Sequence, residues 1–141
     1  MAIGIQFVPV RRTNPPVRAE VEAPQDVEAV LRRACFDCHS NGTEWPWYSR
    51  VAPASWLVAR DVHKARDDMN FTEWPASDPD EVADLIEEIG EQIERDAMPP
   101  KRYRLLHPEA RLSAQERQLL VDWSLAAGGW DRLEDRLPGG R

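Results

Sequence analysis

The residues best suited to chemistry lie in one short run, Cys35-Phe36-Asp37-Cys38-His39. Cysteines three positions apart share one face of a helix, so both thiols can reach the two vinyl groups of one porphyrin. The next residue can bring its imidazole beneath the iron, and thioether bonds hold the macrocycle even when a ligand bond breaks. The pattern C-x-x-C-H is typical of covalent haem c attachment. We therefore predict haem on Cys35 and Cys38, with His39 as an iron ligand.

Three other interpretations of this run stay open. A zinc site needs two further ligands at finger-like spacing, and the other histidines, His63 and His107, follow no such pattern. A thioredoxin-like redox pair is expected in a βαβ setting, and none is visible. The histidine can also follow a C-x-x-C pair by chance. A disulfide scaffold is excluded, because two neighbouring cysteines are too few to staple 141 residues.

Met98 is the residue that we expect at the sixth coordination position of the iron. It follows a long predicted helix and precedes two prolines, so its side chain leaves the helical repeat on a stiff loop. Ligation by histidine and methionine raises the potential of haem iron and suits electron transfer. Met98 can instead be core filler, in which case the distal ligand would be His63, His107 or Met69.

An aromatic loop follows the cysteine motif and could line the haem. Indole, phenol and guanidinium groups can donate hydrogen bonds to haem propionates. We expect Trp47, Tyr48 or Arg50 to contact the haem or its propionates, unless they only pack the first helix on the rest of the chain. Tyr103 and Arg104 are further candidates of this kind. The other tryptophans are expected to serve packing: Trp56, Trp74, Trp123 and Trp130.

About four helices are expected to position these residues, so the predicted fold class is all-α. Apolar residues recur at helical spacing in the first and third of these helices, and no strand-like alternation is longer than three or four residues. Three of the predicted helices span residues 26–39, 53–69 and 78–97, and the last begins at the capping box of Ser113 and ends at Gly128-Gly129.

Capping residues and loops delimit these helices. Asp26 is a candidate N-cap of the first helix, and Asp78, followed by proline, is the candidate N-cap of the third. Residues 43–52 and 101–112 are expected to be loops.

The length of 141 residues suits one domain with its own core. With 18 Lys and Arg against 25 Asp and Glu, the net charge is −7, and an acidic chain without a basic run argues against nucleic acid as a partner. We expect a haem-binding domain in residues 24–130 between tails in residues 1–23 and 131–141.

The apolar octet Ile3–Val10 in the first tail is too short to cross a bilayer, which needs roughly 20 residues. We interpret it either as the remnant of a longer membrane anchor or as a strap on the surface of the domain.

The run CFDCHSNGTEWPWYSRVAPASWLVARDV resembles the small bacterial haem-binding domain family of cytochrome c type. The later MPP and LHPEARLS segments and the closing helix with Trp123 resemble it too, so the likeness covers about residues 5–127. It implies covalent haem c on Cys35 and Cys38, with His39 as proximal and Met98 as distal ligand. It also implies export, and family members commonly begin with an apolar membrane helix, of which only Ile3–Val10 is present here.

We therefore expect a monohaem c-type cytochrome that carries one electron and is not an enzyme. Its expected place is the periplasm or the outer face of the cytoplasmic membrane, and its expected partners are redox proteins. A haem peroxidase and a haem-based ligand sensor, both with a labile sixth site, are the alternatives, followed by a zinc-stabilised module.

Overall fold

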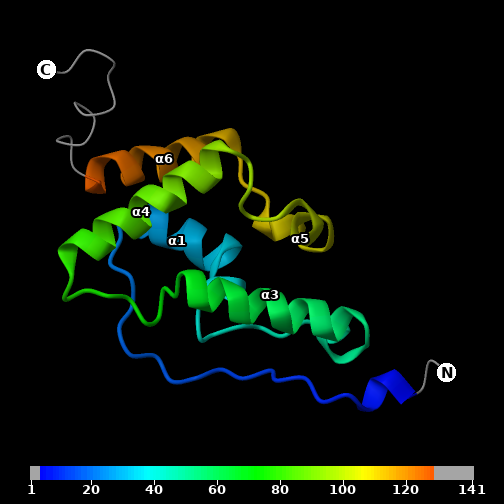
Figure 1. The fold of residues 1–141 in the computed structure, drawn as a ribbon. Helices are drawn as coiled ribbons and strands as arrows, with labels where there is room; N and C mark the ends of the chain where they lie inside the picture. The colour runs from blue at the N-terminus through cyan, green and yellow to red at the C-terminus, as the bar shows by residue number, and fades with distance from the viewer. Residues whose placement is uncertain (1–3, 129–141) are drawn as a thin grey trace, which may run out of the picture. The chain divides into compact units, whose positions relative to one another are not determined.

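The computed structural model describes residues 4–128 (Figure 1). Helices make up 61% of the structure, and no β-strand occurs within that range, which confirms the all-α prediction. The described residues form two compact units. The first unit holds residues 4–22 and 35–74, and the second holds residues 23–34 and 75–128. Trp130 and the predicted tail after it lie outside the described residues, and the predicted domain boundaries stay a prediction.

The first unit is built on one long helix, and an extended N-terminal segment belongs to the same unit. Helix α3 confirms the predicted helix over residues 53–69, and its buried face holds Ser55, Ala59 and Val62. Backbone hydrogen bonds join Val21 to Phe71 and Trp74 to Ala19. The elements of this unit are η1 (Gly4–Phe7), α2 (Phe36–His39), η2 (Trp47–Arg50) and α3 (Ala54–Asp68).

The second unit is built on α4 and α6, which pack side by side (Figure 1). Gly90 allows this close approach, because a Cβ atom at that position would overlap the side chain of Ser124. Ile86, Ile89 and Ile93 of α4 are buried. The elements of this unit are α1 (Gln25–Ala34), α4 (Pro79–Glu94), α5 (Lys101–Leu106), η3 (Pro108–Ala110) and α6 (Ala114–Ala127).

Several predicted element bounds were wrong. The helix expected over residues 26–39 breaks at Cys35, whose φ of −123° leaves the helical range, so α1 and α2 are separate. The helix expected to end near Ala97 ends at Glu94. The expected loop 101–112 contains α5 and η3. The separation of α1 from α2 and the extra helix α5 raise the number of α-helices within residues 4–128 to six, whereas about four were expected.

Two of the three predicted caps are confirmed. The Asp78 side chain accepts a hydrogen bond from the Glu81 amide, and Ser113 and Glu116 form a reciprocal capping box. Asp26 is not an N-cap, because α1 begins one residue earlier. Its carboxylate accepts a hydrogen bond from the Val27 amide instead.

The described chain contains no helix that is both long enough and apolar enough to cross a membrane. Part of the N-terminal apolar octet forms η1, where the Phe7 side chain is exposed.

The Ser113–Glu116 box makes the stability of the second unit depend on pH. Hydrogen bonding to the Ser113 backbone is the largest cause that lowers the pKa of Glu116, and Arg33 lowers it further. A carboxylate whose pKa is lower in the folded than in the unfolded chain stabilises the fold above its unfolded pKa of about 4.3. That contribution is lost as the pH falls through the folded pKa.

We therefore expect Glu116→Gln to lower the free energy of unfolding at neutral pH, with a difference from the wild type that narrows below about pH 4. Urea denaturation of both proteins across this pH range measures the difference in their free energies of unfolding. A difference that stays constant down to pH 3 would show that the charge of Glu116 is not its source.

Candidate haem site

The cysteine motif forms a single closed turn. The amides of Cys38 and His39 donate to the carbonyl oxygen of Cys35 at 3.1 and 2.9 Å. Cys35 therefore lies at the start of the turn, and Cys38 lies three positions later, directly before His39. Both thiols are half-buried, and no disulfide bond joins them. This is the spacing that two thioether bonds to one porphyrin require.

The orientation of the His39 ring suits iron ligation. Its Nδ1 atom lies 3.0 Å from the backbone carbonyl oxygen of Met69. A carbonyl oxygen only accepts hydrogen bonds, so Nδ1 carries the hydrogen and donates it. A neutral imidazole in this tautomer has its lone pair on Nε2, and metal-ligating histidines are commonly held by such a bond from the other ring nitrogen. The residues present thus fit an iron porphyrin.

Aromatic rings of the first unit pack against the cysteine turn. Phe36 is buried and stacks on Phe71 with ring centroids 5.2 Å apart, and Phe71 stacks on Trp74 at 5.8 Å. The ring of His39 lies tilted against Phe71 at 6.0 Å. Because Phe36 lies between the two cysteines in the sequence, burying it fixes the turn while both thiols keep partial exposure.

The chain after His39 is tied to the segment that follows α3. The amide of Phe71 donates to the carbonyl oxygen of His39 at 2.7 Å, and the amide of Asn41 donates to the Thr72 hydroxyl at 2.8 Å. The side chains of Asn70 and Asn41 are hydrogen-bonded at 2.8 Å. The same segment therefore supplies both the acceptor for the His39 ring and the support for its backbone.

Arg66 is a supporting residue near the cysteine turn that sequence reasoning missed. From α3, its guanidinium donates to the carbonyl oxygens of Ser40 and Thr13 at 2.7 and 2.8 Å. It also donates to the side chains of Asn14 and Thr43. Burial lowers the pKa of Arg66, and negative charge at Cys38 and Glu73 opposes that shift.

A signal for Arg66 was present in the sequence. Arg66 follows Val62 by four positions and Ala59 by seven, so it belongs to the buried face of α3. A charged residue on such a face needs hydrogen-bonding partners.

Residues 12–14 of the N-terminal segment form hydrogen bonds with the rest of the first unit, and both interpretations of the octet Ile3–Val10 stay predictions. Arg12 donates to the carbonyl oxygen of Ser49 at 2.9 Å. Asn14 donates to the carbonyl oxygen of Thr43 at 3.0 Å, and its own side-chain oxygen accepts from the indole of Trp45 at 3.1 Å. Residues 12–14 therefore hold the start and the end of the aromatic loop.

The three predicted propionate contacts lie together on η2, in the same unit as the cysteine turn. Trp47 is 78% exposed, and its ring packs edge-on against Tyr48 with centroids 5.8 Å apart. Arg50 is exposed at the end of η2. Exposure of an indole to this degree is unusual for a residue that only packs a core, and a role in haem binding stays a prediction.

Met98 lies in the second unit, four positions after Glu94, the last residue of α4. It is half-buried, and its amide lies 3.4 Å from the carbonyl oxygen of Gln92. Its role as an iron ligand stays a prediction from the sequence.

The other candidate ligands have their own contacts within their units. Nε2 of His63 lies 3.1 Å from the carbonyl oxygen of Arg11, and Met69 is buried. His107 stacks on Tyr103 at 4.2 Å, and its Nδ1 lies 2.7 Å from the Glu109 carboxylate.

The remaining residues singled out in the sequence lie in both units, and their proposed roles stay predictions. Arg104 forms an ion pair with Asp96. Trp74 is buried, Trp123 is half-buried and Trp56 is 38% exposed. Across residues 4–128, no three His, Cys, Asp or Glu side chains gather as a group that could hold a metal ion.

Comparison with protein families gave one match. The family model described as "Haem-binding domain" matches residues 1–126, which is most of the chain. Comparison with curated proteins and with solved structures gave no significant match.

The contacts of Arg66 predict a large effect on stability. Arg66→Met leaves several oxygen acceptors without their donor, so we expect the free energy of unfolding to fall by about 2 kcal/mol. Arg66→Lys keeps the positive charge but lacks the planar guanidinium group with its several donors. We expect it to lower the free energy of unfolding by less than Arg66→Met does. Chemical denaturation measures both.

Lys64→Ala is the matched control, because Lys64 lies on the same helix in an exposed pair with Asp68. We expect it to change the free energy of unfolding by about 0.5 kcal/mol or less. Equal losses for the Arg66 and Lys64 variants would show that the Arg66 contacts do not stabilise the unit.

Proposed function

The chain belongs to the haem-binding domain family, and on this premise we propose that it is a monohaem c-type cytochrome that carries one electron between proteins. The observation that carries the proposal is the cysteine turn together with the contact between His39 Nδ1 and the Met69 carbonyl oxygen. Two thiols on one turn and an imidazole held by the Met69 carbonyl oxygen are what covalent haem c needs.

Cys35 and Cys38 supply the covalent attachment. Each thiol would add its sulfur and hydrogen across one vinyl double bond, which forms a thioether and needs no oxidant. The buried Phe36 between the cysteines holds their spacing in the absence of any disulfide. The bound haem would supply a single iron that exchanges one electron, as the cofactor of the protein.

His39 would be the proximal ligand and Met98 the distal ligand. The bond from His39 Nδ1 to the Met69 carbonyl oxygen orients the ring and increases the basicity of Nε2. A thioether ligand beside the imidazole would raise the potential of the iron, which suits a carrier better than an oxygen-activating enzyme. Trp47, Tyr48 and Arg50 are the proposed contacts of the haem edge and propionates.

Location and partners follow from the same chemistry. Because haem c is attached outside the cytoplasm, we place the protein in the periplasm or at the outer face of the cytoplasmic membrane. The net charge of −7 becomes more negative with the haem propionates, so a redox partner with a basic surface would dock by salt-sensitive attraction.

The visible spectrum of protein matured with haem c in the periplasm tests the cofactor. We expect a c-type spectrum whose colour stays with the polypeptide after acid–acetone extraction. Cys35→Ser with Cys38→Ser should lose this retention, and His39→Ala should lose the six-coordinate spectrum. Thr43→Ser, a conservative change in the following loop, is the control that should retain both. Complete extraction of colour from the wild type would contradict covalent attachment.

Binding of carbon monoxide distinguishes a carrier from a sensor or a peroxidase. With Met98 on the iron, the reduced protein should bind the gas weakly and turn over peroxide very slowly. Met98→Ala should increase both, whereas Met69→Leu should leave both near the wild-type level. Rapid binding and rapid peroxide turnover by the wild type would favour the enzyme or the sensor.

A further inference from the structure

The helix that precedes Met98 ends in an unusual way. Asp96 has a φ of 55°, in the left-handed region that favours glycine. The amide of Asp96 donates to the carbonyl oxygen of Ile93 at 3.1 Å, and the amide of Ala97 donates to that of Gln92 at 3.0 Å. This pair of bonds defines a Schellman motif, in which glycine is the common residue at the position of Asp96. An aspartate there calls for a reason beyond helix termination.

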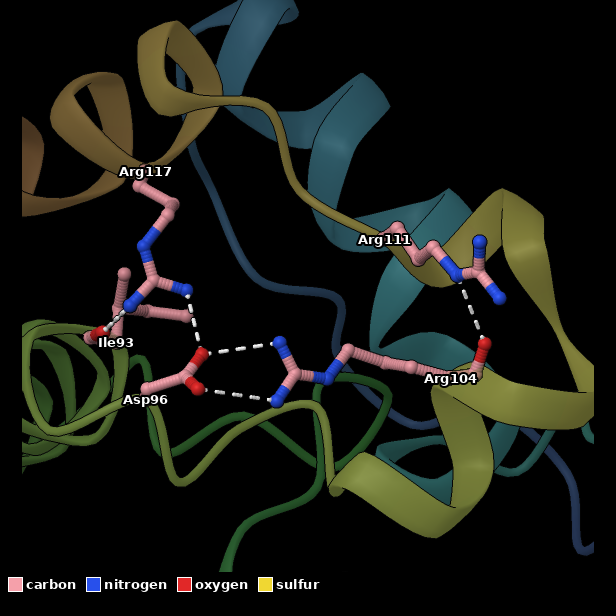
Figure 2. A network of polar contacts seen from close by, with 5 residues as sticks. All are labelled: Ile93, Asp96, Arg104, Arg111 and Arg117. Atoms are coloured by element: carbon pink, nitrogen blue, oxygen red, sulfur yellow. Dashed lines mark hydrogen bonds and ion pairs between the residues drawn. The ribbon is translucent and has the colours of Figure 1, made fainter.

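The carboxylate of Asp96 supplies that reason, because it bridges two arginines (Figure 2). Arg104 of α5 donates to both oxygens of the carboxylate, at 2.9 and 3.2 Å. Arg117 of α6 donates to one of these oxygens at 3.0 Å. A bidentate ion pair of this kind fixes the orientation of the two groups as well as the distance between them.

The arginines extend the network to the backbone on both sides (Figure 2). Arg117 also donates to the carbonyl oxygen of Ile93, in the last turn of α4. Arg111 donates to the carbonyl oxygen of Arg104 at 3.0 Å. The end of α4, helix α5 and the first turns of α6 are therefore held to one another around Asp96.

The segment that carries Met98 is enclosed by this network. Only residues 97–100 lie between Asp96 and the first residue of α5, and two of them are prolines with a fixed φ. Because both ends of so short a segment are fixed, its backbone has few conformations left. The thioether of Met98 is thus presented from a preorganised loop.

We propose that Asp96, Arg104 and Arg117 are positioning residues that hold the Met98 segment in the conformation from which its sulfur ligates iron. This inference rests on the proposed function, in which Met98 is the distal ligand. None of the three side chains needs to touch the haem. They would act by limiting the conformations of the segment, so that its sulfur loses little freedom when it binds. Competing ligands would then displace the sulfur less readily.

Two substitutions at Asp96 distinguish the effect of its carboxylate from the effect of its backbone conformation. Asp96→Asn keeps the shape and tolerates a positive φ but loses the charge. Asp96→Gly relieves the backbone and also loses the charge. If the carboxylate holds the segment, both should weaken the far-red band of sulfur-ligated ferric haem and raise the affinity of the ferrous protein for carbon monoxide by about tenfold.

Glu94→Gln is the control, because it removes a carboxylate from the exposed last residue of α4. It should leave the band and the affinity unchanged. Thermal unfolding monitored by circular dichroism checks that each variant is folded. If an Asp96 variant is unfolded, Arg104→Lys takes its place, because it keeps the charge but loses the two-pronged bond, and the same increase in affinity is expected.

Met98→Ala, measured alongside, separates failure of this inference from failure of the proposed function. Loss of the far-red band in Met98→Ala, with wild-type band and affinity in the folded Asp96 or Arg104 variants, would overturn the positioning role alone. A far-red band that survives in Met98→Ala would overturn the ligand assignment and the inference with it.

Discussion

The hydrogen bond from the His39 ring to the Met69 carbonyl oxygen is the contact on which the haem site depends. In the proposed cytochrome the cysteine turn would attach the haem, but attachment alone would leave the imidazole free to rotate. Met69 lies where α3 ends, and an extended backbone there directs its carbonyl oxygen at Nδ1. The neighbouring amide of Phe71 donates to the carbonyl oxygen of His39, so one short segment holds both the ring and the backbone of this proposed ligand.

Polar side chains within each unit carry much of this positioning. In the first unit Arg66 ties the chain after His39 to the N-terminal segment, and in the second unit Asp96 ties α4 to α5 and α6. Both use planar guanidinium groups, which satisfy several oxygen atoms at once. The protein thus supports its candidate ligand segments with directional bonds as well as with apolar packing.

How far the site can be predicted from the sequence depends on whether each of its features is determined by residues close together in the chain. The spacing of Cys35, Cys38 and His39 is local and typical of covalent haem attachment, so the sequence alone predicts this part of the site. The partnership of His39 with Met69 depends on where a helix ends thirty positions later, and no local pattern encodes it. Helix α5 was missed because six residues are too few to show a helical period. The pairing of Arg104 with Asp96 depends on the left-handed turn that brings that carboxylate within reach, and no local pattern predicts it.

Mass spectrometry of a tryptic digest of the mature protein tests the central claim most directly. Cleavage after Arg33 and Arg50 releases one peptide, residues 34–50, that contains both cysteines and His39. The account predicts that this peptide alone carries the added mass of one haem, in thioether linkage to both thiols. Recovery of the same peptide at its unmodified mass, from protein exported by cells that attach haem c to other cytochromes, would contradict it.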